Sequence, residues 1–314
     1  MHRKDKRRQP YFLLRLSGTL IAFGVVVFLI WRNWTDFLAA LGSLSIGYFL
    51  IVLLLALLSR LMITCRWFIL LRVVEPGISF IEVFKLSFVG LFTTNVLPST
   101  IGGDVVKLGG AVRAGLRSPG VTASLVMDRL VGMATMATFL PAGIIKILQS
   151  DNPPAILMLS APGTLFSGLW QKFVHFIFDT GNSLKNWFNQ PDTLFFASLC
   201  SYIHMACTFT MVYLILFQLA DPISWWVSGG LWVLVYFITL IPVSINGLGL
   251  QEVSMSIIYH SFGGVSESNS LVLALLMRVA FMAASLPGAL FLPVVMSGRS
   301  EQKKDSIRDE LINE

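Results

Sequence analysis

The sequence predicts an all-α polytopic membrane protein with about six full spans and two re-entrant helical hairpins in inverted repeats, or with eight ordinary spans. Of its 314 residues, 55% are hydrophobic and 13% are charged, and the mean hydropathy is +0.75. Soluble domains carry about 25% charge. A helix-breaking phrase also occurs twice, each time after an apolar run. It reads Pro98-Ser99-Thr100-Ile101-Gly102-Gly103 in the first copy and Pro242-Val243-Ser244-Ile245-Asn246-Gly247 in the second.

The N-terminal segment, residues 1–10, is basic and precedes an apolar run over 11–31. Lys and Arg concentrate on the cytoplasmic side of membrane spans, so we interpret this segment as a cytoplasmic topology signal. Nucleic-acid binding is not expected, because no basic soluble domain follows. The run 11–31 exceeds a signal-peptide core and lacks a small-residue cleavage site, which predicts a retained span. The charged tail, 299–314, is also expected in the cytoplasm.

A single transmembrane domain is predicted over 11–298, with a first half of about 46–148 and a second half of about 193–297. A spanning helix needs about 20 apolar residues. The clear spans are 11–31, 46–71, 121–148, 193–219 and 270–297, and 155–170 is a weaker one because it contains Pro162-Gly163.

Two further apolar stretches, 80–101 and 222–245, run into the repeated phrase. Backbone groups freed there must be satisfied by protein or water, so each phrase is a surface loop or the tip of a re-entrant hairpin. Basic residues flank the first phrase, whereas no Lys or Arg occurs between Lys185 and Arg278 around the second. This charge distribution favours hairpins that enter from opposite faces, with both termini inside.

Charges at membrane depth occur at matching places in the two halves. Asp104 and Glu252 lie just beyond the two phrases, and Arg129 and Arg278 lie within later apolar stretches. Intramembrane charge is costly and needs a reason. Two arginines near the membrane centre could bind phosphate in a fork. Asp104, Asp128 and Glu252 would pair with the arginines in the absence of lipid, or couple to protons. A structural ion-pair network that locks two broken helices together is the alternative.

The helices after the phrases are predicted to begin with Asp104 as N-cap and near 248–251, respectively. Helix N-termini attract anions, glycine permits close approach, and hydroxyls can donate hydrogen bonds. Together these features predict a substrate-binding set. Its members are Asn95, Ser99, Thr100, Gly102, Gly103, Asp104, Arg129, Ser244, Asn246, Gly247, Glu252 and Arg278.

The remaining polar residues of the apolar segments have structural interpretations. Arg72 is expected at a cytoplasmic helix end, and Arg60 and Arg66 are expected to extend toward it, although the depth of Arg60 leaves a functional role open. His204 is expected in an interhelical hydrogen bond rather than as a ligand or proton relay. The three cysteines are expected as free thiols. No metal, cofactor or catalytic motif is found.

The runs 95–104, 128–130 and 241–252 resemble those of the lysylphosphatidylglycerol synthase transmembrane (flippase-like) family. The resemblance covers roughly 10–298 and implies a polytopic inner-membrane protein of a prokaryote. In aminoacyl-phospholipid members, this region moves a lipid that a separate C-terminal soluble domain makes. Here the chain ends soon after Arg299, which argues against synthetase activity. Asp128 replaces the family's usual Glu, and Gln251 replaces a common basic residue.

The resemblance and the charges together predict a flippase for a phosphate-bearing lipid, such as an aminoacyl-phospholipid or a polyprenyl-linked lipid. An accessory subunit that presents lipid to a glycosyltransferase or synthase is the alternative, and an unrecognised lipid-modifying enzyme is a third reading. The expected partner is a membrane lipid with an anionic headgroup. A homo-oligomer is compatible with the sequence, which does not name the lipid or the direction of movement.

Overall fold

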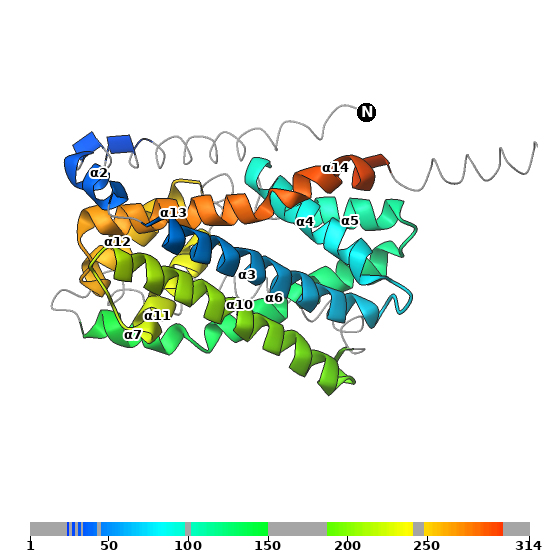
Figure 1. The fold of residues 1–314 in the computed structure, drawn as a ribbon. Coiled ribbons are helices and arrows are strands. Elements are labelled where there is room, and N and C mark those ends of the chain that lie inside the picture. Colours follow the sequence, from blue (N-terminus) through cyan, green and yellow to red (C-terminus); the bar gives the residue numbers. More distant parts are fainter. Residues whose placement is uncertain are drawn as a thin grey trace, which may run out of the picture.

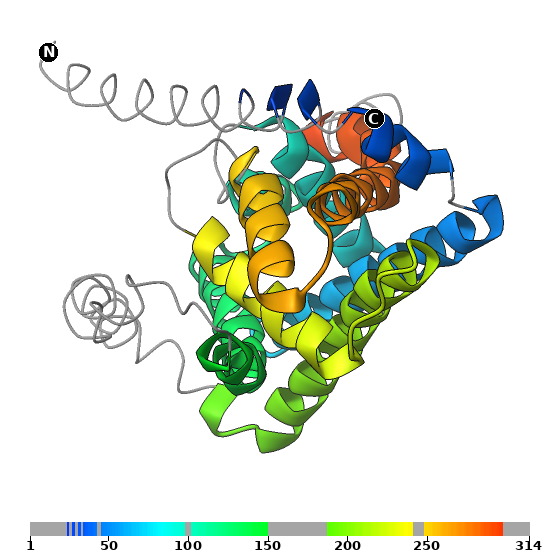
Figure 2. The same cartoon turned by 90° about the vertical axis from the view of Figure 1, so that its left-hand side faces the viewer.

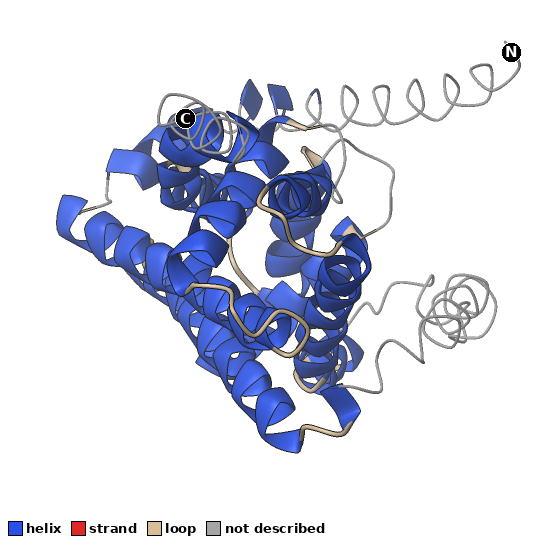
Figure 3. Ribbon diagram, turned by 90° about the vertical axis from the view of Figure 1, so that its right-hand side faces the viewer, coloured by secondary structure: helices blue, strands red, loops and turns tan. Residues whose placement is uncertain are grey.

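The computed structural model describes residues 34–42, 45–97, 102–149, 187–240 and 248–297, with a few isolated positions between 24 and 32. All regular structure within these ranges is helical (Figure 3). The predicted segments that lie almost wholly outside the described residues are 1–10, 11–31, 155–170 and 299–314.

Three helices are long and apolar enough to cross a membrane: α3 (Ile46–Arg72), α10 (Pro191–Gln218) and α13 (Glu267–Ser285). They confirm the predicted spans 46–71 and 193–219 and most of 270–297. At 1.5 Å per residue, α3 and α10 are each roughly 40 Å long, which exceeds the hydrocarbon core of a bilayer. A short amphipathic helix, α2 (Trp34–Gly42), packs beside α13.

Two predicted spans are interrupted. The predicted span 121–148 forms α6 (Ser118–Ala137) and α7 (Leu140–Leu148), which are bent by 40° at their junction. The C-terminal span ends at Ser285, and α14 (Pro287–Ser297) follows it. A proline lies in the first turn of both α7 and α14. Proline has no N–H to donate and clashes with the preceding turn, so it favours a new helix over the continuation of the old one.

A helix ends before each repeated phrase, as predicted, and the next helix begins at Gly102 within the first phrase and at Leu250 after the second. The first hairpin consists of α4 (Phe80–Val96) and α5 (Gly102–Arg113). The second consists of α11 (Trp225–Thr239) and α12 (Leu250–Gly263). Figure 1 shows the two hairpins at opposite ends of the molecule, on either side of its centre.

The first half (α3–α7) and the second half (α10–α14) correspond helix by helix. Helices α3 and α10 pack side by side and run in opposite directions (Figures 1 and 2). Ser59 and His204, 145 positions apart, are hydrogen-bonded to each other where these helices meet. When 145 is added to the number of each buried residue of α3, the result is the number of a buried residue of α10. The pairs are Val52/Ala197, Ala56/Ser201, Ser59/His204, Thr64/Phe209, Arg66/Met211, Trp67/Val212, Leu70/Ile215 and Leu71/Leu216.

The last helix of each half packs on the hairpin of the other half: α7 contacts α11, and α14 contacts α4. Glycine permits both contacts. A Cβ added at Gly143 would lie 2.5 Å from the carbonyl oxygen of Gly230, and one at Gly288 would overlap the carbonyl of Phe88. The backbones are therefore in direct contact at these points, which ties the two halves together.

A loop acid fixes the start of each arginine-bearing helix. The backbone N–H of Arg117, before α6, donates to Glu75 Oε1 at 3.0 Å. At the corresponding place before α13, the N–H of Ser266 donates to Asp221 Oδ2 at 2.9 Å. Each acid satisfies a helix N-terminal N–H group and so positions the helix that follows.

Candidate functional site

A cavity of about 340 Å³ lies at the centre of the molecule, between the hairpins and the long helices. This volume is at the lower end of the range for small-molecule sites, about 300–1,000 Å³. The cations that line it in the described part of the chain are Arg60, Arg66, Lys107, Arg129 and Arg278. The other lining residues are Ile63, Leu91, Thr94, Asn95, Asp104, Asp128, Gly132, Met136, His204, Trp232, Tyr236, Thr239, Leu240, Gln251, Phe281 and Met282.

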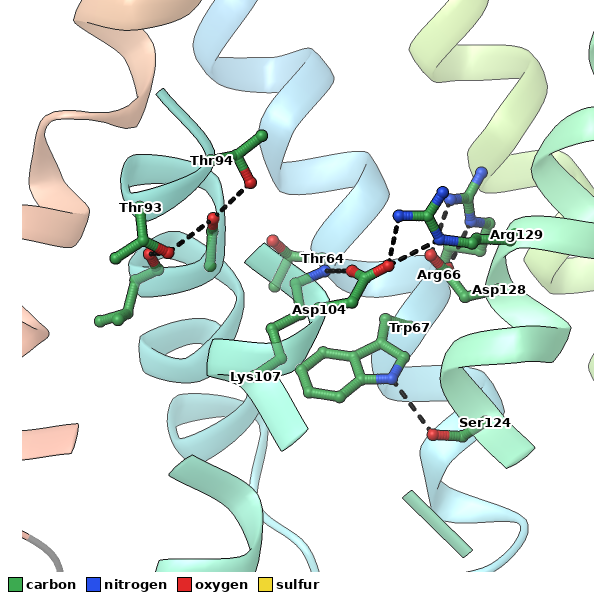
Figure 4. Close-up of polar contacts among 12 residues, drawn as sticks. Thr64, Arg66, Trp67, Thr93, Thr94, Asp104, Lys107, Ser124, Asp128 and Arg129 are labelled. Carbon is green, nitrogen blue, oxygen red and sulfur yellow. Dashed lines mark hydrogen bonds and ion pairs between the residues drawn. The ribbon is translucent and has the colours of Figure 1, made fainter. Parts of the chain in front are cut away.

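Asp104 and Arg129 form an ion pair at one side of the cavity. Arg129 Nε donates to Asp104 Oδ2 at 2.6 Å, and its Nη2 lies at the same distance from that oxygen (Figure 4). The Arg129 side chain is 40% exposed and that of Asp104 is 22% exposed. The pair is therefore open to the cavity rather than sealed in protein.

Glu252 and Arg278 form the corresponding pair in the second half. Arg278 Nε donates to Glu252 Oε1 at 2.5 Å. Asp104 and Glu252 are each the third residue of their helix, and Arg129 and Arg278 occupy the same position along α6 and α13. This pair is more buried, with side chains 13% and 6% exposed, and Glu252 Oε2 has no hydrogen-bond partner among the described residues.

Arg66 and Asp128 form a third pair, which the sequence reasoning missed. Arg66 donates to both carboxylate oxygens of Asp128, at 2.6 and 2.9 Å, and to Ser201 Oγ at 3.0 Å. Both side chains are 9% exposed. The prediction that Arg66 extends toward the membrane surface is therefore wrong: a bidentate partner holds it inside. Gly132 makes room, since a Cβ there would lie 2.8 Å from Arg66 Nη1.

Lys107 is a second cation that the sequence reasoning left out of the site. It is buried over the indole ring of Trp67, with Nζ 5.0 Å from the ring centroid. Its Nζ also lies 3.8 Å from Asp104 Oδ1, so Asp104 stands between Lys107 and Arg129 (Figure 4). One signal was present in the sequence: Lys107 follows Asp104 at the i, i+3 spacing of neighbours on a helix surface.

Arg60 projects into the cavity from the middle of α3. Its guanidinium carbon lies 4.3 Å from the centroid of the Phe281 ring. Its Nε is buried and has no hydrogen-bond partner among the described residues. The side chain of Arg60 therefore does not extend toward the membrane surface. The functional role that its depth left open stays a prediction.

His204 makes the predicted interhelical hydrogen bond. Its Nδ1 lies 2.6 Å from Ser59 Oγ, and the two groups join α10 to α3. The imidazole also lines the cavity. The three cysteines are free, as expected. Within the described part of the chain, no group of three or more His, Cys, Asp or Glu residues could hold a metal ion.

The remaining predicted site residues fall in different places. Asn95 lines the cavity and donates to Ser285 Oγ on α13 at 2.7 Å. Gly102 and Gly103 are buried away from it: a Cβ at Gly103 would overlap Thr94 and lie 2.5 Å from the carbonyl oxygen of Gly90. These glycines bring α5 against α4. Those outside the described residues are Ser99, Thr100, Ser244, Asn246 and Gly247.

The predicted helix starts are half correct. Helix α12 begins at Leu250, inside the expected range, and its N-cap Gly249 has a φ of 75° that favours glycine. Helix α5 begins at Gly102, so Asp104 lies in the first turn and is not the N-cap. Close packing on α4 keeps the two glycines helical, and the Asp104 carboxylate turns to Arg129 and Lys107 instead.

The comparison with known families agrees with this architecture. A profile described as the lysylphosphatidylglycerol synthase TM region matches residues 15–288. The chain belongs to this family. Among curated proteins, none matches the chain. Membership in the lysylphosphatidylglycerol synthase transmembrane family, together with the apolar helices, makes the chain a membrane-embedded helical protein and indicates a lipid-related function.

Proposed function

We propose that the chain is a transporter that moves a phosphate-bearing lipid between the leaflets of a membrane. The observation that carries this proposal is the charge of the central cavity. Among the described residues, five cations line it, against the two carboxylates Asp104 and Asp128. Even when Glu252, the partner of Arg278, is included, cations exceed carboxylates by two. Such an excess in a low-dielectric interior favours an anionic ligand.

We also propose that the two halves are an inverted repeat, with hairpins that enter the bilayer from opposite faces without crossing it. The opposite directions of α3 and α10 and the matching positions of the two ion pairs support this proposal. At 17 residues or fewer, the four hairpin helices are each shorter than a typical span of about 20 residues. Positive-inside reasoning then puts both termini in the cytoplasm of a prokaryotic cell.

The geometry suggests how a headgroup would be held. Arg129 shares one carboxylate with Lys107 and, at 40% exposure, is the most exposed of the paired arginines, so its guanidinium is the one that a phosphate in the cavity would reach most easily. The second pair, Glu252 and Arg278, stands on the other hairpin and is nearly closed. In an inverted repeat, exchange of conformation between the halves would open the second pair and close the first, while the lipid tails stay in the bilayer.

Leaflet exchange in proteoliposomes tests the proposal. Dithionite quenching of fluorescent phosphatidylglycerol should proceed beyond the outer leaflet with wild-type protein. The double variant Asp104→Asn/Arg129→Gln removes both charges of the pair and should slow exchange at least about tenfold, since a charge-assisted hydrogen bond is worth about 1.5–3 kcal/mol. Arg113→Gln, an exposed cation on the same helix α5, is the control and should exchange like wild type.

Equal exchange by the wild type and the double variant would exclude this site as the transport site. A wild type that exchanges no faster than protein-free vesicles, yet copurifies with a lipid-modifying enzyme, would favour the accessory-subunit function. New lipid products detected by mass spectrometry after incubation would instead indicate an enzyme.

A further inference from the structure

Arg60 differs from the other arginines of the cavity in its surroundings. Arg66, Arg129 and Arg278 each contact a carboxylate. No carboxylate of the described residues pairs with Arg60, whose contact is the face of Phe281. Its buried Nε lacks any hydrogen-bond partner in the described part of the chain. A buried guanidinium nitrogen in this condition is costly unless something supplies the missing acceptor.

The second half of the chain shows that the fold does not need a charge at this position. With the 145-residue offset that relates α3 to α10, Arg60 corresponds to Met205 and Arg66 to Met211. Aligning the two ion pairs makes Lys107 correspond to Met255 and Asp128 to Met277. All four methionines are almost completely buried in the core of the second half. The same helix packing is therefore made with four apolar side chains.

The comparison indicates that these four charged residues are present because of the cavity and are not needed for helix packing. The four charged residues line the cavity, and none of their methionine counterparts does. Three of the four are internally compensated, because Arg66 pairs with Asp128 and Lys107 lies near Asp104. Arg60 alone in this set pairs with no carboxylate of the described residues, and its Nε is a donor without a hydrogen-bond partner among them.

We propose that Arg60, whose guanidinium lies over the Phe281 ring and lines the cavity, binds the ligand's phosphate oxyanion in addition to Arg129. The inference rests on the proposed function in taking the ligand to be the transported lipid. Stacking on an aromatic ring fixes the guanidinium plane and leaves its N–H edge for a planar, two-oxygen contact with phosphate. A lipid phosphate and free phosphate share this chemistry.

Binding to purified protein in phosphatidylcholine nanodiscs tests the inference. The probes are a short-chain fluorescent phosphatidylglycerol and, separately, inorganic phosphate. Arg60→Met installs the residue of the second half and should weaken phosphatidylglycerol binding about tenfold to a hundredfold, the range expected for charge-assisted hydrogen bonds. Arg60→Lys keeps the charge but loses the fork, and should bind with intermediate affinity. The control Met205→Leu changes the corresponding buried position and should bind like wild type.

Each outcome decides something. Wild-type affinity in Arg60→Met overturns the inference, as does an equal loss in Met205→Leu. Arg60→Gln provides a second neutral variant if Arg60→Met does not fold, as judged by its thermal unfolding. Displacement of the fluorescent lipid by millimolar inorganic phosphate would identify free phosphate as a ligand of the same residue.

The proposed function can fail separately. Arg60-dependent binding by a protein that exchanges no lipid would remove the transport proposal and keep the inference. Normal lipid exchange, together with lipid binding that does not depend on Arg60, would keep the transport proposal and remove the inference.

Discussion

Arg66 and Asp128 carry opposite charges deep in the protein, where desolvation opposes both. Their bidentate contact and the bond to Ser201 recover much of that cost. At the corresponding positions the second half has Met211 and Met277, which are fully buried. Loss of one partner should therefore be far more harmful than loss of both, since one charge would be left buried alone.

The stability of this pair can be measured with a double-mutant cycle. Asp128→Met should lower the free energy of unfolding by about 3–5 kcal/mol, because it leaves Arg66 unpaired. The double variant Arg66→Met/Asp128→Met reproduces the second half and should recover most of that loss. Denaturant unfolding in micelles gives the values. A double variant as unstable as the sum of the single variants would show that the charges do not act as a pair.

At the same scale, the sequence predicts some contacts and misses others for a physical reason. The pairs Asp104/Arg129 and Glu252/Arg278 repeat at nearly equal spacing, so each copy supports the other. Arg66 and Asp128 are 62 residues apart and occur once, and no periodicity links them. From the sequence alone, a single arginine in an apolar segment could pair with an acid inside the protein or extend its side chain to the membrane surface. Asp128 was expected to pair with the arginines of the site, and its partner proves to be Arg66.

Helix positions depend on short contacts at the ends and crossings of the elements. Asp221, in the loop before α11, is hydrogen-bonded by the N–H of Ser266 and by the Asn269 side chain, at 2.9 and 2.8 Å. Partial burial alone would raise the pKa of Asp221, but these hydrogen bonds outweigh it and hold the pKa below its ordinary value. The ionised loop acid therefore favours the folded start of α13, the helix that bears Arg278.

Asp221 should make stability depend on pH. A lowered folded-state pKa contributes stability above the unfolded-state pKa of about 3.9, and this contribution disappears as the pH falls through the folded-state value. Wild type should have a higher Tm than Asp221→Asn at pH 7, and the difference should shrink below about pH 4. Thermal scans across pH 3–7 measure it. Asn269→Ala should reduce the difference, and a difference that grows on acidification would contradict the assignment.

The close glycine contact between α7 and α11 predicts that a larger residue there destabilises the protein. A Cβ added at Gly230 would lie 2.8 Å from the backbone carbon of Ala142, which cannot move aside as a side chain could. Gly230→Ala should therefore destabilise the protein by about 1–3 kcal/mol. Gly109 on α5 has open space around its Cβ position. Gly109→Ala should be neutral or stabilising by up to about 1 kcal/mol, and equal effects of the two would refute the packing argument.

Helix existence and approximate bounds were predictable because apolar length and helix breakers are local properties. The junctions after α6 and α13 were not, because a proline within an apolar run can kink a span or end it, and tertiary packing decides. Here α7 and α14 leave their spans to pack on the opposite half's hairpin. The glycines that allow this contact have no local signature that distinguishes them from other glycines in the chain.

For the whole molecule, the contact between α4 and α13 connects the hairpin of one half to the arginine-bearing helix of the other. Asn95 and Ser285 make that contact beside the cavity, with a hydrogen bond of 2.7 Å. If lipid movement requires the halves to exchange conformations, this distance must change during each cycle. If the lipid instead slides along a static groove, the contact can stay fixed.

Cross-linking distinguishes these two mechanisms. In a background with Cys65, Cys200 and Cys207 replaced, Asn95→Cys/Ser285→Cys joined by a short bifunctional thiol reagent should lower leaflet exchange at least tenfold, while phosphatidylglycerol binding remains, because only the movement between halves is blocked.

A matched control joins two parts of the same half. The control pair is Glu75→Cys and Arg117→Cys, because Glu75 Oε1 accepts from the backbone N–H of Arg117 at the start of α6. Their cross-link should leave exchange at its level before the reagent. Exchange by each double variant is measured before and after the reagent is added, which separates the effect of the cross-link from that of the substitutions, and mass spectrometry should verify the cross-link. Undiminished exchange by the fully cross-linked α4–α13 protein would exclude relative movement at this contact and favour a static path for the headgroup.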